Sequence, residues 1–114
     1  MNAETLNALN EVREAKRMVL SGLTDNTVSQ EEKIMLGNIL INLQDQEDAL
    51  INLTLQGMVD KINASNAALK NLIQQMEAAS GDISRISNTI KKISKVLSTL
   101  TVITSKAISS GLLG

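Results

Sequence analysis

The side chains that carry out most enzyme chemistry are missing from this sequence. The 114 residues include no His and no Cys, which excludes an imidazole general base, a thiolate nucleophile and the usual zinc sites. Ser87 and Lys91 lie one helical turn apart and could form a Ser–Lys pair. Such a pair needs a desolvated lysine in a cleft, whereas Lys91 falls on the charged face of its predicted helix. We therefore predict that the protein is not an enzyme and has no cofactor and no small-molecule substrate.

The densest group of acidic residues is Asp45, Glu47 and Asp48. Calcium loops need alternating oxygen ligands around a sharp glycine turn, but this stretch has the pattern of a helix. Di-metal helical bundles need Glu-x-x-His pairs, which the sequence lacks. We therefore predict no metal site here. The carboxylates are expected to face solvent or to meet basic side chains of a neighbouring helix.

Basic residues gather in the last third of the chain. Residues 82–114 carry five Lys or Arg against one Asp or Glu, whereas residues 1–81 carry six against eleven. On a helical wheel the basic residues fill one arc opposite an apolar stripe, as in helices that bind anionic membranes. The absence of Trp and Phe anchors favours a protein partner over a membrane, and the lack of stacking aromatics argues against nucleic acid. The candidate residues for contact with an anionic surface are Arg85, Lys91, Lys92, Lys95 and Lys106.

The composition restricts how these side chains can be positioned. The chain has no Phe, Trp, Tyr or Pro, and 43% of its residues are hydrophobic. A core of Ile, Leu, Val, Met and Ala fills helix–helix seams well, and without proline nothing forbids long helices. The apolar content is too high for native disorder. We therefore predict one all-α domain spanning residues 1–114.

The first predicted helix covers residues 3–20, where apolar residues recur at steps of three and four. It is expected to end at Ser21-Gly22, because glycine takes the left-handed conformation at a helix end without strain. Ser29 opens the next helix, with Glu32 placed to complete a capping box.

The second predicted helix covers residues 29–79, and Gly57 is a point at which it could kink. The third covers residues 82–109, after a break at Ser80-Gly81-Asp82. The two helices either fold back antiparallel at this break or continue as one straight rod. The turn chemistry of Ser-Gly-Asp favours the fold-back.

A heptad seam of apolar residues runs through the second and third helices in unbroken phase, the a/d pattern of a coiled coil. Three slender helices cannot bury it alone. The predicted fold is therefore an elongated antiparallel helical hairpin or coiled-coil bundle completed by oligomerisation, with a dimer of four-helix cross-section as the first expectation. The predicted interface residues are Leu69, Leu72, Met76, Ile83, Ile86, Ile90, Ile93, Leu97 and Leu100.

These patterns predict a non-catalytic assembly or interaction protein that self-associates or binds partner helices through the seam. One alternative is a membrane-active protein that uses the cationic C-terminal helix to form pores or to bind surfaces. Another is a secretion adaptor or chaperone that offers an apolar groove to a client. The start of the chain lacks the features of a signal peptide, and no stretch reaches the roughly 18 apolar residues of a spanning helix. We expect a soluble, cytoplasmic protein, with signal-less secretion as the other route.

Overall fold

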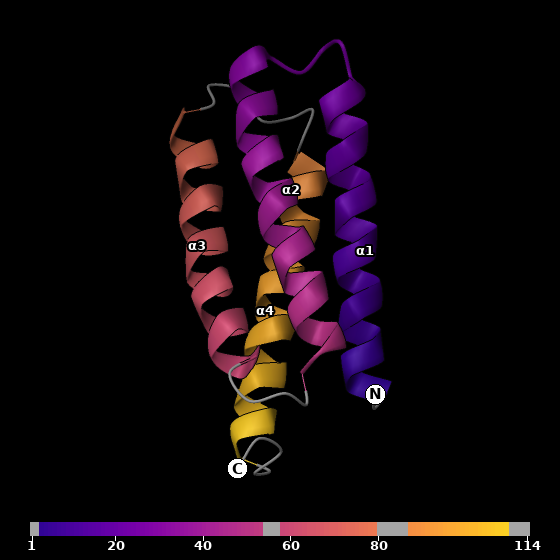
Figure 1. Cartoon of the computed structure of the whole chain (residues 1–114). Coiled ribbons are helices and arrows are strands. Elements are labelled where there is room, and N and C mark those ends of the chain that lie inside the picture. Colours follow the sequence, from indigo (N-terminus) through magenta and orange to yellow (C-terminus); the bar gives the residue numbers. More distant parts are fainter. Residues whose placement is uncertain (1–2, 54–57, 80–86, 110–114) are drawn as a thin grey trace.

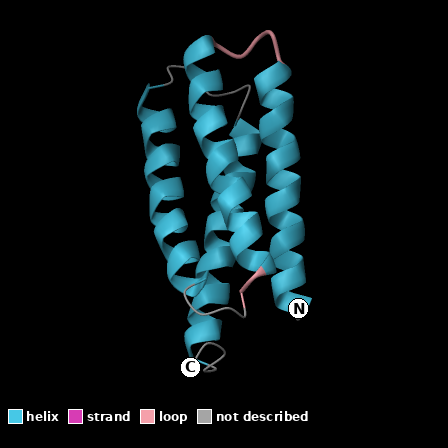
Figure 2. Ribbon diagram, viewed as in Figure 1, coloured by secondary structure: helices cyan, strands magenta, loops and turns pink. Residues whose placement is uncertain are grey.

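Four helices of similar length form a bundle in the computed structural model, which describes residues 3–53, 58–79 and 87–109. They are α1 (Ala3–Thr24), α2 (Gln30–Ile51), α3 (Met58–Ala79) and α4 (Ser87–Ser109). Each helix packs against two neighbours, in the order α1–α2–α3–α4 and back to α1 (Figure 1). The described residues contain no strand (Figure 2). The prediction of an all-α fold is confirmed.

The structure has two helices, α2 and α3, where the sequence pattern predicted one helix over residues 29–79. They pack side by side instead of end to end. The C-cap of α2 is Asn52, whose side-chain Nδ2 donates to the Asp48 carbonyl at 2.9 Å. The backbone N–H of Asn52 donates to the same carbonyl at 3.2 Å, so Asn52 closes the last turn of α2 with both its main chain and its side chain. Gly57, the expected kink, lies outside the described residues.

At the other end of α2, the predicted capping box is confirmed. The Ser29 Oγ accepts from the Glu32 backbone N–H at 3.2 Å, and the Glu32 Oε1 accepts from the Ser29 N–H at 3.3 Å. α1, in contrast, passes through Ser21-Gly22 and ends at Thr24. Gly22 serves packing here, because a Cβ at this position would lie 2.9 Å from the Leu36 Cδ1 of α2. The glycine lies where α1 and α2 approach closely, so that a larger residue would require the Leu36 side chain to shift, and it does not end α1.

The core consists of aliphatic side chains from all four helices. Its largest fully buried apolar members are Leu36, Ile39, Leu43, Leu50, Ile62, Leu69, Met76, Ile93, Leu100 and Val12. The four-helix cross-section that we expected from a dimer is thus completed within one chain. Burial of the seam therefore does not itself require a second copy.

The overall dimensions differ from those of an extended coiled coil. The bundle measures 46 × 22 × 17 Å, and its radius of gyration is 14.4 Å, close to the value of about 13 Å expected for a compact chain of this length. α3 and α4 pack against each other, which is the fold-back arrangement and not a straight rod. The break at residues 80–82 lies outside the described part of the chain.

Candidate functional site

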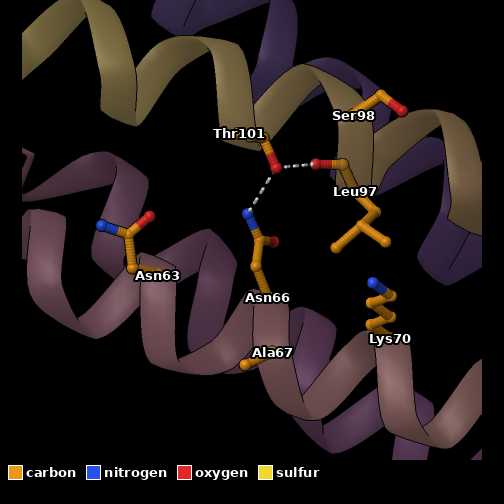
Figure 3. Close-up of a pocket in the computed structure, with 7 residues that line it drawn as sticks. All are labelled: Asn63, Asn66, Ala67, Lys70, Leu97, Ser98 and Thr101. Atoms are coloured by element: carbon orange, nitrogen blue, oxygen red, sulfur yellow. Dashed lines mark hydrogen bonds between the residues drawn. The ribbon is translucent and has the colours of Figure 1, made fainter.

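An open groove lies between α3 and α4 on the outside of the bundle (Figure 3). Its volume is about 520 Å³. On each helix the lining residues comprise one adjacent pair and positions three or four residues from it, so they form the facing edges of the two helices. From α3 these are Asn63, Asn66, Ala67 and Lys70, and from α4 they are Leu97, Ser98 and Thr101.

One long hydrogen bond connects the two walls of the groove. The Asn66 Nδ2 donates to the Thr101 Oγ1 at 3.4 Å, and the Thr101 hydroxyl donates to the Leu97 carbonyl at 2.9 Å (Figure 3). The first distance exceeds the usual 2.7–3.2 Å range of strong N–H···O bonds. Asn66 is only 7% exposed, and its Oδ1 has no hydrogen-bond partner. A buried, unpaired amide oxygen costs about 1–3 kcal/mol, so this position is not optimised for stability.

Lys70 and Leu97 give the groove a cationic spot beside an apolar one. Leu97 is partly buried and packs against the core. Lys70 is exposed and extends from α3 toward Leu97 (Figure 3). Its ammonium forms no ion pair with any residue that the structure describes. The groove can therefore accept an apolar side chain together with a carboxylate.

The three acidic residues of α2, Asp45, Glu47 and Asp48, have different surroundings. Glu47 accepts from the Arg13 Nε at 2.7 Å and from the Lys16 Nζ at 2.8 Å, and it thereby joins α2 to α1. The hydrogen bond from Lys16 and, to a smaller extent, the one from Arg13 lower the pKa of the Glu47 carboxyl. Asp45 and Asp48 remain exposed. The expectation that the cluster would meet basic side chains of a neighbouring helix thus holds for Glu47.

Two of the predicted surface lysines hold α4 to α1. The Lys92 Nζ lies 3.2 Å from the Glu14 Oε2, and the Lys95 Nζ lies 3.6 Å from the Glu11 Oε1. The sequence contained a signal for these pairs, since the glutamates and the lysines are both spaced by three residues. Lys91 is exposed. Arg85 and the side chain of Lys106 lie outside the described part of the chain.

Five of the nine predicted interface residues are buried in the core of a single copy of the chain. Leu72 and Leu97 are only partly buried, and Leu97 reaches the groove. Ile83 and Ile86 lie outside the described residues. The remaining members are buried in the core: Leu69, Met76, Ile90, Ile93 and Leu100.

A second surface, on α2, was missed by sequence analysis. Ile34 and Ile41 are 60% and 59% exposed, the highest values among the large apolar side chains that the structure describes. Asn38 and Asp45 are also exposed, and the spacing places all four residues on one helix face. We call this face the α2 ridge. Its signal in the sequence is a pair of isoleucines seven residues apart, in the same heptad phase as the seam, which becomes informative only once the core-facing side of α2 is known.

Within the described part of the chain, no group of three or more acidic side chains is arranged to hold a metal ion. Likewise, none of the described helices combines the length and the apolar character needed to cross a membrane. Comparisons with family models, with curated proteins and with solved structures give no match. The groove and the α2 ridge are therefore interpreted from their own chemistry.

Proposed function

We propose that the protein is a non-catalytic interaction protein whose partner docks a helix in the α3–α4 groove. The observation that carries this proposal is the groove itself, with the partly buried Leu97 beside Lys70, which forms no ion pair with a described residue. Helices that bind in grooves insert apolar side chains spaced by three or four residues, while polar groups at the rim set their register. Asn63, Ser98 and Thr101 supply such a rim.

The surrounding fold supports this role because it keeps the groove walls in place. Apolar packing buries the inner faces of α3 and α4, and ion pairs attach α4 to α1. A rigid scaffold reduces the entropy that is lost when a partner binds. The membrane-active alternative requires α4 to leave the bundle. That step would break both ion pairs and expose Ile93 and Leu100, which are fully buried.

Site-specific photo-crosslinking in the cells that produce the protein tests the proposal. A benzophenone amino acid replaces Ser98 in the groove, and the matched control places it at Ala64, an exposed position on α3 outside the groove. We expect a discrete adduct from the Ser98 position alone. Ala67→Arg, which fills the groove, should remove this adduct, whereas Ala64→Arg should not. Adducts of equal yield from both positions, or none from Ser98, would refute the proposal.

A further inference from the structure

We infer that the occupant of the groove is the α2 ridge of a second copy of this chain. The inference rests on the proposed function and names its partner. The α2 ridge offers exposed apolar side chains, and the groove offers a hollow lined in part by the apolar Leu97. Ile34 and Ile41 stand out from α2, and a Cβ at Gly37, which lies between them, would meet nothing within 4 Å. The side of the ridge is therefore open to an approaching helix.

Polar and apolar groups follow in the same order on the two surfaces, about one helical turn apart, although the individual steps differ by one residue. Asp45 follows Ile41 by one helical turn on α2, and Lys70 follows Ala67 by one turn on α3. With Ile41 seated on Ala67 and Leu97, the Asp45 carboxylate reaches the Lys70 ammonium.

The same register extends in the other direction. Asn38 precedes Ile41 by one turn, and Asn63 precedes Ala67 by one turn. Their two amides can donate to and accept from each other. A single alignment, with α2 of one copy parallel to α3 of the other, thus matches an amide pair, an apolar contact and an ion pair.

The charges agree with this pairing. Asp45 and Asp48 form no ion pair with any described residue, and neither does Lys70. The surface on α2 is acidic, and the groove carries one cation among its described lining residues. Among the described residues, neither surface finds an internal partner for its charge, and the other surface supplies one.

The described lining of the groove includes no residue of α2, so one copy can use both surfaces at the same time. Two copies can exchange these contacts reciprocally about a two-fold axis, or the contacts can run head to tail from copy to copy and form rings or longer oligomers. In either case the proportion of oligomer rises with the concentration of the protein.

A charge-swap experiment on the full chain tests the inference by sedimentation velocity at low salt. Lys70→Glu brings two carboxylates together at the contact, and Asp45→Lys brings two ammonium groups together. Each variant alone should remain at the monomer mass of 12.3 kDa, with association weakened by more than about tenfold. An equimolar mixture should assemble again, because each variant's ridge then matches the other variant's groove.

Matched controls reverse charges on α3 outside the groove. Lys61→Glu and Asp60→Lys alter exposed residues and should leave assembly unchanged, while circular dichroism confirms that every variant is folded. A wild-type chain that stays monomeric overturns the inference, as does a mixture that fails to assemble or single variants that assemble like wild type. If a different protein crosslinks at Ser98 while the wild type is monomeric, self-docking is refuted and the proposed groove function stands. If nothing crosslinks there, the proposed function falls as well.

Discussion

Two glycines within helices give a matched test of the packing between α1 and α2. A Cβ at Gly22 would lie 2.9 Å from the Leu36 Cδ1, whereas a Cβ at Gly37 would meet nothing within 4 Å. In a helix interior, Ala is about 1 kcal/mol more favourable than Gly. We therefore predict that Gly37→Ala raises the free energy of unfolding by about 1 kcal/mol and that Gly22→Ala lowers it.

The expected loss at Gly22 follows from the position of Leu36. Carbon atoms in contact prefer separations of about 3.5–4.0 Å, so a new methyl group at 2.9 Å must displace the leucine. Leu36 is fully buried and cannot move into solvent. Overpacking of this kind costs about 1–3 kcal/mol. Subtracting a helix-propensity gain of at most about 1 kcal/mol leaves a net destabilisation of about 1 kcal/mol.

Urea unfolding followed by far-ultraviolet circular dichroism measures both effects, since the chain has no aromatic residue for fluorescence. Dilute samples exclude any contribution from self-association. The double variant Gly22→Ala/Leu36→Ala is the control: its loss should be smaller than the sum of the two single losses, because the cavity left by Leu36 accommodates the new methyl group. Equal stabilisation by Gly22→Ala and Gly37→Ala would refute the close approach of α1 and α2 at Gly22.

Three further measurements probe the groove, the ion pairs and the lysines. Asn66→Leu should raise the melting temperature, with a gain of about 1 kcal/mol, because it removes a buried unpaired oxygen and loses only a long hydrogen bond; a lower melting temperature would contradict this reasoning. The pKa of the Glu47 carboxyl is lowered in the folded state, so its ionised form stabilises the fold. This stabilisation is fully present above the ordinary pKa of 4.5, and it is lost as the pH falls through the lower folded-state pKa. Glu47→Gln should cost about 1–2 kcal/mol at neutral pH and flatten this acid dependence in urea titrations; an unchanged pH profile would show that the carboxylate contributes nothing. Anionic vesicles should not float the wild-type chain at physiological salt, because carboxylates of α1 neutralise Lys92 and Lys95; flotation would favour the membrane-active alternative.

Periodicity predicted the fold class, yet it did not predict where the seam is buried. A three–four repeat of apolar residues is the same whether the facing helix belongs to the same chain or to another one. Leu69 and Leu100 satisfy the repeat inside a single bundle. The number of helices in the chain decides between the two cases, and the sequence pattern indicated three.

The sequence pattern indicated three helices instead of four because it does not mark the boundary between α2 and α3. No proline separates α2 from α3, and the apolar stripe continues past the end of α2. The structure ends α2 with Asn52, which bonds back to the Asp48 carbonyl. Asparagine is a weak local signal, because Asn63 and Asn66 lie within α3 without ending it. Tertiary packing of two shorter helices decides the boundary, and it is not visible in a local window.

The groove and the ridge depart from what the bundle alone requires. A self-sufficient four-helix bundle gains stability from apolar residues inside and polar residues outside. Here Asn66 lies inside with an unpaired oxygen, while Ile34 and Ile41 lie outside on a face that contributes nothing to the core. Departures from the rules of stability concentrate where function imposes other requirements. In the proposed contact between copies, Ile34 and Ile41 become buried and the hollow beside Asn66 is filled, so one proposed contact involves both features.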